Sequence, residues 1–215
     1  MNAVRTISTL LTLTLVCCAG SCSRMQRRSG GTDLLDTGLV GWQQIGGGQD
    51  TWRFQDGILY TAGGAGGWLA TIRQYDDFRL SLEFRVPPGG NSGVFIRSPL
   101  EGDPAYTGME IQILDDYAEQ WQGLNPYQYT ASIYDVQAPS ERATKHAGKW
   151  QTMVVAARGP QIEVVVNGQK VIDTNVNYYP YKTSTHPGLK REGGYIGLQN
   201  HGGRVEFRNI RIREL

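Results

Sequence analysis

Cysteine and net charge are both scarce in this 215-residue chain. The only three cysteines lie near the N-terminus, at Cys17, Cys18 and Cys22, so the rest of the chain cannot form a disulfide framework. The three histidines are dispersed, at His146, His186 and His201, which does not predict a zinc site. With 21 Lys and Arg against 20 Asp and Glu, the formal charge is +1. The chain therefore offers no electrostatic footprint for nucleic acid or an anionic membrane, so we expect no nucleic-acid partner and membrane contact through a lipid anchor only. A neutral partner such as a sugar is compatible with this charge.

A hydrophobic run long enough to span a membrane is also missing. The apolar run 7–16 follows the single charge of Arg5 and precedes the small residues 19–21, which is the pattern of a secretory signal. The placement of Cys22 resembles a bacterial lipoprotein signal, so we expect residues 1–22 to be removed or lipidated, with the lipid on Cys22. An ordinary cleaved signal is the alternative, and Cys18 is the other candidate for lipidation. Residues 23–33 are polar and rich in Gly and Ser, as a flexible tether would be. These features predict a periplasmic or cell-surface lipoprotein of a bacterium.

The remaining residues, 34–215, predict one all-β domain. Apolar and polar residues alternate in the segment 79–86 (RLSLEFRV), and similar short runs recur along the chain at 57–62, 92–97, 109–114, 150–158, 162–173, 194–199 and 205–215. Turn signals separate these runs, and Asn167-Gly168 is the strongest hairpin signal. No helical period extends over three turns, and we expect residues 115–148 to form loops over one edge. The pattern is typical of a β-sandwich or jelly roll of two antiparallel sheets.

Some of these strands carry unusual residues on the side that should face away from the core. In MEIQIL (109–114) the isoleucines take the core side, and in GYIGLQ (194–199) the mid-strand Gly197 suggests close approach of a ligand or another chain segment. If the strands are neighbours, one open face collects aromatic and planar polar groups suited to a sugar ring, namely Phe95, Arg97, Glu110, Gln112, Tyr195 and Gln199, with His201 at its rim.

Each of these residues also has an ordinary structural interpretation. Glu110 and Arg97 could form an exposed ion pair of little energetic value, and His201 could be a turn residue with positive φ. Glu206 and Arg208 are interpreted as a solvated or locally paired strand face. Asp115-Asp116 could bind a cation, but the spacing does not match a calcium loop.

Several segments, taken in order, resemble the 3-keto-disaccharide hydrolase (3-keto-glucoside 1,2-lyase/hydratase) domain family. They include WRFQDGILY, GGNSGVFIR, GMEIQILDD, VNGQKVID and GYIGLQNHGG, and the resemblance extends over about residues 34–215. It implies a concanavalin-like jelly roll of two sheets, secretion or lipid anchoring in bacteria, and action on glycosides oxidised at C3. Glycosidases of the laminarinase type have three acids on one strand; here the matching positions are Glu110, Gln112 and Leu114, so two acids are missing and direct double displacement is disfavoured.

The chemistry implied by the resemblance needs a base for the C2 proton, a donor for the enolate oxygen and an acid for the leaving oxygen. We expect Arg97 to bind the enolate oxygen and Glu110 or His201 to transfer protons. Hydroxyl contacts are expected from polar residues and stacking from aromatic ones, together Asn91, Phe95, Gln112, Asp115, Tyr195 and Gln199. We expect no cofactor, with a divalent cation left open, and a carbohydrate partner. The alternative function is a noncatalytic carbohydrate-binding module, lectin-like or laminin-G-like.

Overall fold

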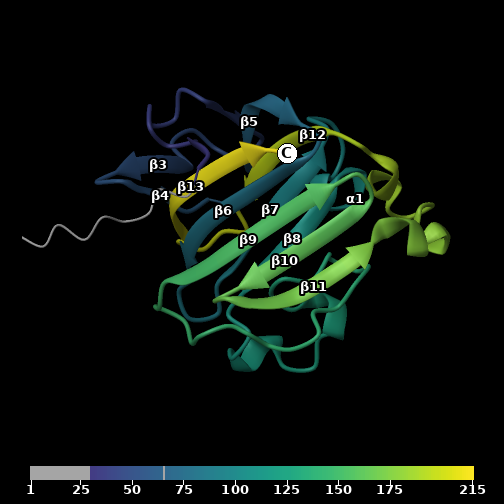
Figure 1. Cartoon of the computed structure of the whole chain (residues 1–215). Helices are drawn as coiled ribbons and strands as arrows, with labels where there is room; N and C mark the ends of the chain where they lie inside the picture. Colours follow the sequence, from purple (N-terminus) through teal and green to yellow (C-terminus); the bar gives the residue numbers. More distant parts are fainter. Residues whose placement is uncertain (1–29, 65) are drawn as a thin grey trace, which may run out of the picture.

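The structure is a computed structural model that describes residues 30–64 and 66–215. Two antiparallel sheets pack face to face, as Figure 1 shows. Sheet A has the strand order β11-β10-β9-β6-β13-β4-β3, with β1 also paired to β13, and sheet B has the order β2-β5-β12-β7-β8. The sandwich predicted from the sequence is therefore confirmed.

The strands are short and follow the turn signals of the sequence. Those of sheet A are β1 (Thr32–Asp33), β3 (Trp52–Gln55), β4 (Ile58–Thr61), β6 (Phe78–Arg85), β9 (Gln151–Arg158), β10 (Gln161–Val166), β11 (Gln169–Asn175) and β13 (Glu206–Glu214). Those of sheet B are β2 (Trp42–Ile45), β5 (Trp68–Tyr75), β7 (Asn91–Ser98), β8 (Met109–Leu114) and β12 (Gly194–Gln199). One short helix, α1 (Pro104–Thr107), and five 3₁₀ turns, Glu119–Trp121, Pro126–Gln128, Val176–Tyr178, Pro180–Lys182 and Pro187–Lys190, complete the described secondary structure.

Alternation of side chains explains how sheet A builds the core. Leu80 and Phe84 of β6 are fully buried and belong to the same hydrophobic cluster as Val94, Ile111 and Ile196 of sheet B. The polar residues between them point away from the core, as a strand period of two requires.

The predicted hairpin at Asn167-Gly168 is confirmed. Both residues have positive φ, 50° and 88°, and they connect β10 to β11 in register. A two-residue type I′ turn needs this backbone at both positions, which Asn and Gly tolerate best.

The domain begins slightly earlier than the sequence indicated. Thr32 and Asp33, placed in the tether by composition, pair with Ile212 and Arg211 of β13. The predicted signal and Cys22 lie outside the described residues. Within the described part of the chain, no helix is long and apolar enough to cross a membrane.

Candidate functional site

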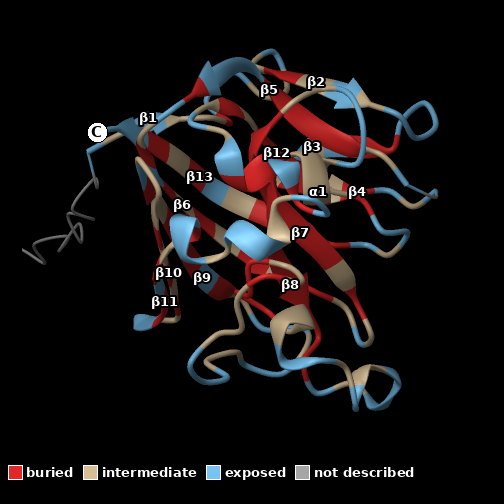
Figure 2. Cartoon of the chain, turned by 90° about the vertical axis from the view of Figure 1, so that its right-hand side faces the viewer, coloured by how far each residue is buried: buried red, intermediate tan, exposed pale blue. Residues whose placement is uncertain are grey.

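Strands β7 and β8 are buried on both faces, unlike β6 and β9 of the other sheet. Seven of the eight residues of β7 and all six of β8 are buried, and Figure 2 shows β7 coloured red along most of its length. One face of these strands packs in the core between the sheets. Their outer face must therefore be covered by other segments of the chain.

Glu110 lies on this outer face with its side chain folded across Gly93. Only 3% of Glu110 is exposed, and a Cβ added at Gly93 would lie 2.1 Å from Oε1 of Glu110. Any larger residue at position 93 would displace the carboxyl group. Gly93 thus has a specific function in the sheet, which is to leave room for an acid beside the strand backbone.

The carboxyl group of Glu110 is electrostatically unusual. Oε1 is buried and has no hydrogen-bond partner among the described residues. Burial, with a smaller contribution from the charge of Asp103, raises the pKa of Glu110 from 4.5 to about 8. A buried acid with a free oxygen and a pKa near the working pH has the properties expected of a proton-transfer group.

Polar amides surround this carboxyl. Gly93 pairs with Gln112 of β8, and the pairing of Leu198 with Val94 brings Gln199 of β12 to the other side of Gly93. The amide oxygen of Gln199 is buried and unpaired within the described structure, as is that of Asn91. By contrast, Oε1 of Gln112 accepts a hydrogen bond from the backbone N–H of Ile113 at 2.9 Å. Asn91 and Gln199 are therefore the amides left free for a ligand.

An aromatic cluster forms the adjoining part of the face. Phe95 pairs with Glu110 across the strands and meets Trp68 edge to face, with ring centroids 5.4 Å apart. Tyr195 packs against the same cluster. Trp68 lies over Gly197, where an added Cβ would be 2.1 Å from the indole ring. The mid-strand glycine noted in the sequence thus makes room for an aromatic side chain of the site.

Arg97 does not share this face, and the prediction that it lies beside Glu110 is wrong. Its side chain is 1% exposed, and its guanidinium donates to the carbonyl oxygens of Asp76 (3.0 Å), Gly159 (2.7 Å) and Arg191 (3.3 Å). Its ion-pair partner is Asp77, at 3.2 Å, which also excludes the proposed exposed pair with Glu110.

A β-bulge explains why the alternation fails at this position. Between Tyr195 and Gly197 the pairing of β12 with β7 shifts register, and Arg97 has a φ of 51°. A bulge adds a residue to one strand and reverses the side that the following side chain faces. Arg97 therefore fastens the ends of the two sheets together.

Two further predicted residues lie at the strand ends. Asp115 is 7% exposed and accepts the backbone N–H of Gly89 at 2.9 Å, so its carboxylate already holds a loop in place. His201 is exposed and is not among the residues with positive φ, so the turn-residue interpretation that needs positive φ is wrong. It lies two residues beyond the end of β12 at Gln199, and its function at the rim of the site stays a prediction.

The wall beside Glu110 comes from segments that the sequence left as loops. The backbone N–H of Tyr134 donates to the carbonyl oxygen of Glu110 at 2.9 Å, and the Tyr134 ring meets Tyr106 of α1 edge to face. The ring of His186 lies 4.9 Å from that of Tyr106. Burial raises the pKa of both phenols, and the nearby charge of Glu110 adds to this. The one local signal for this wall is Asp103-Pro104, a typical helix start, whose side chain caps Ala105 at 3.0 Å.

The remaining polar pairs have structural functions. Glu206 pairs with Arg85 and Arg208 pairs with Glu83, as predicted, and both arginines stack on Trp150. Among the described residues, no three His, Cys, Asp or Glu side chains are arranged to hold a metal ion.

The known proteins to which this chain is similar have names that refer to carbohydrates. A 3-keto-disaccharide hydrolase of Bacteroides thetaiotaomicron is 27% identical over 209 residues, which covers 76% of this chain and 70% of the relative. A crystal structure from Parabacteroides distasonis, described as a candidate glycosyl hydrolase, is 28% identical with a TM-score of 0.78 and covers 86% of this chain and 100% of that one. A carbohydrate-binding module from Bacillus subtilis is 15% identical with a TM-score of 0.54, covers 81% of this chain and 96% of that one, and shows likeness of fold alone. The model of the 3-keto-alpha-glucoside-1,2-lyase-like domain matches residues 30–213, and the chain therefore belongs to this family of glycosyl hydrolase-like proteins.

Proposed function

We propose that this chain is a secreted, lipid-anchored bacterial enzyme that cleaves the glycosidic bond of 3-keto-glucosides or 3-keto-disaccharides. The observation that carries the proposal is the Glu110 carboxyl group, which is buried over Gly93 with a free oxygen and a pKa of about 8. The name of the Bacteroides relative supports the same substrate class.

Glu110 first acts as the base. The C3 ketone acidifies the C2 proton of the sugar, and a carboxylate with a raised pKa is a stronger base than an ordinary glutamate. At pH 7 about a tenth of the molecules carry it ionised, given that pKa. Proton removal forms an enolate, the C1–O bond then breaks, and a C1=C2 double bond forms. Glu110, now protonated, returns its proton to the leaving oxygen, and water later adds OH to C1 and H to C2.

The enolate oxygen needs a donor, and Arg97 cannot supply it because its guanidinium is fully engaged elsewhere. In our proposal the amide N–H groups of Gln199 and Asn91 take this function, and their side-chain oxygens, which lack partners in the described chain, accept hydrogen bonds from sugar hydroxyls. Tyr195, which is half-buried against Trp68 and Phe95, offers the aromatic surface on which the sugar ring stacks, and these two buried rings support it.

The location follows from the N-terminal sequence. A lipid on Cys22 would hold the domain at the periplasmic or outer surface of a bacterial membrane. Radiolabelled palmitate incorporated by the producing cells, and lost in Cys22→Ser, is the expected result. Label that persists in Cys22→Ser but is lost in Cys18→Ser would move the anchor to Cys18.

The decisive experiment is incubation of the purified protein with 3-keto-trehalose, following released sugar and a transient enone absorbance. Glu110→Gln keeps the size of the side chain and removes the base, so turnover should fall by at least about a hundredfold, within the usual contribution of acid–base catalysis. Glu119→Gln, on an exposed 3₁₀ turn, is the matched control and should keep full activity.

For the native enzyme, kcat/KM should rise with pH until about 8, as Glu110 ionises. Full turnover by Glu110→Gln would refute the assignment of the base. Sugar binding without turnover of any 3-keto-glucoside would instead support the alternative, a noncatalytic carbohydrate-binding module.

A further inference from the structure

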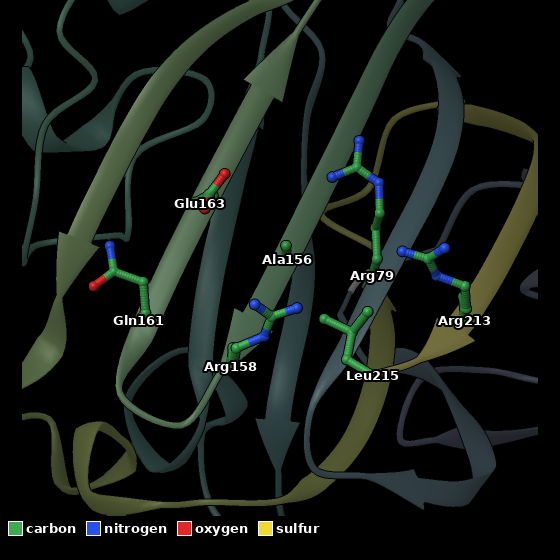
Figure 3. A pocket seen from close by; sticks show the side chains of 7 residues that line it. All are labelled: Arg79, Ala156, Arg158, Gln161, Glu163, Arg213 and Leu215. Carbon is green, nitrogen blue, oxygen red and sulfur yellow. The ribbon is translucent and has the colours of Figure 1, made fainter.

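The outer face of sheet A, on the opposite side of the sandwich from Glu110, carries a group of exposed arginines. Arg79 of β6, Arg158 of β9 and Arg213 of β13 line a hollow of about 170 Å³ whose floor includes Ala156. Figure 3 shows their guanidinium groups around this hollow, on three neighbouring strands. Glu163 is the one acidic side chain in the lining, so the side chains around the hollow carry a net charge of two positive units.

This arrangement is unfavourable in the isolated domain. Arg79 and Arg213 are directly opposite each other in the sheet, and like charges in such a pair destabilise it. The next residue in the same row is Ala156, which cannot pair with either. Within residues 30–64 and 66–215, none of the three arginines forms an ion pair, as the paired side chains are Arg73, Arg85, Arg97, Lys170, Arg204, Arg208 and Arg211.

On β6 and β13 the other outward-facing arginines are paired. Arg85, Arg208 and Arg211 each have a carboxylate partner. On these two strands the uncompensated charge is therefore confined to the end around Arg79 and Arg213. Such a local excess on a nearly neutral chain is complementary to an external anionic surface.

The chain enters the domain at this patch. Gly30 lines a second hollow together with Arg79, Arg211 and Arg213, and the carbonyl oxygen of Gly31 accepts a hydrogen bond from Arg211 at 2.9 Å. Gly30 follows Cys22 by only eight residue steps, a span of at most about 28 Å. A lipid on Cys22 would keep the arginines within that distance of the membrane.

We propose that the arginine face, defined by Arg79, Arg158 and Arg213, docks on the phosphodiester headgroups of the membrane that holds the anchor. This inference rests on the proposed lipid anchoring and goes beyond it, because docking fixes the orientation of the domain. Sheet A then faces the lipid, and the Glu110 site on the outer face of sheet B opens away from it. Guanidinium groups suit this function because they bind phosphate oxygens in pairs.

The test uses the chain from residue 22 onward with Cys22→Ser, so that no lipid contributes. Co-sedimentation is measured with vesicles of phosphatidylcholine alone and of a phosphatidylglycerol–phosphatidylcholine mixture. We expect binding to the anionic vesicles only, weakening as salt is added. Arg79→Ser with Arg213→Ser should weaken binding about 30-fold, since each arginine near such a surface contributes roughly a factor of five.

The matched control is Arg142→Ser with Lys190→Ser, which removes the same charge from exposed positions outside sheet A. It should bind within about twofold of the parent, allowing for a screened long-range effect. Equal weakening in both double variants, or no binding of the parent to anionic vesicles, would overturn the proposal. Hydrolysis of 3-keto-trehalose in solution should be unchanged in both double variants. The vesicle assay therefore tests the docking proposal, and the hydrolysis assay tests the catalytic proposal separately.

Discussion

Replacing Glu110 by glutamine should stabilise the fold in a way that grows with pH. In the folded protein the pKa of Glu110 is raised from 4.5 to about 8 because the carboxyl group is buried. Below pH 4.5 the acid is protonated in both the folded and the unfolded chain, so its ionisation does not lower the free energy of unfolding. As the pH rises, the unfolded chain ionises first and is favoured, and the native protein loses stability until the folded carboxyl also ionises at about pH 8.

The size of the effect follows from the shift. Each unit of pKa difference corresponds to about 1.4 kcal/mol, so a shift from 4.5 to about 8 gives a maximal penalty of about 5 kcal/mol, reached above pH 8. At pH 7 the penalty is about 3 kcal/mol, for the same pKa values. Glutamine cannot ionise and avoids this cost at every pH. Its amide also changes local hydrogen bonding, but that contribution is constant with pH.

The assay is urea unfolding of the native chain and of Glu110→Gln at pH 5, 7 and 9, and the quantity compared is the difference in unfolding free energy. This difference should increase by about 1.4 kcal/mol per pH unit between the two pKa values and then level off. Glu119→Gln, which removes a carboxylate from the surface, controls for the general effect of charge. A difference for Glu110→Gln that stays constant from pH 5 to pH 9 would show that the carboxyl ionises as readily folded as unfolded, and the reasoning would fail.

Three other substitutions test the packing of the site and its support. Gly93→Ala should displace the Glu110 carboxyl, because the new Cβ would lie 2.1 Å from Oε1. We expect the unfolding free energy to fall by about 1–3 kcal/mol and kcat to decrease. An unchanged kcat would contradict the placement of the Glu110 carboxyl over Gly93. Gly197→Ala should push the Trp68 ring out of place by a similar clash, which a shift in indole fluorescence and a higher KM would report, while an unaltered spectrum would oppose it. Arg97→Met should lower the unfolding free energy by at least about 3 kcal/mol in denaturant titrations, since it removes a buried cation from several acceptors; a fully stable variant with only catalysis impaired would restore Arg97 to the site.

Alternation along strands was enough to find the polar face of the candidate site. Glu110 and Gln112 were placed on the outer side of β8 because Ile111 and Ile113 are apolar, and the structure buries both isoleucines in the core. The same rule places Phe95 correctly, since it depends only on a strand period of two. Catalytic functions for these side chains remain predictions.

The side chain of Arg97 does not follow the alternation of a regular strand. A bulge adds one residue to β7, and positive φ at an arginine has no signal in the sequence. The wall formed by Tyr106, Tyr134 and His186 could not be predicted either, because it depends on contacts between segments far apart in the chain that lack a periodic pattern. Local periodicity therefore identifies the strands of the site but not the loops that close it.

The net charge of the sequence does not indicate the arginine face on sheet A. A formal charge of +1 argued against binding to an anionic membrane by overall charge, yet Arg79 and Arg213 stand side by side without counter-ions in the described structure. The total charge is a sum over two separate environments, the buried face around Glu110 and the arginine face on sheet A. They also respond differently to salt: ions screen exposed arginines over about 8 Å at physiological strength, whereas the pKa of Glu110 is raised mainly by burial, which salt does not relieve. The proposed membrane docking and the proposed proton transfer are therefore expected to vary independently, because no ion pair joins the two faces within the described residues.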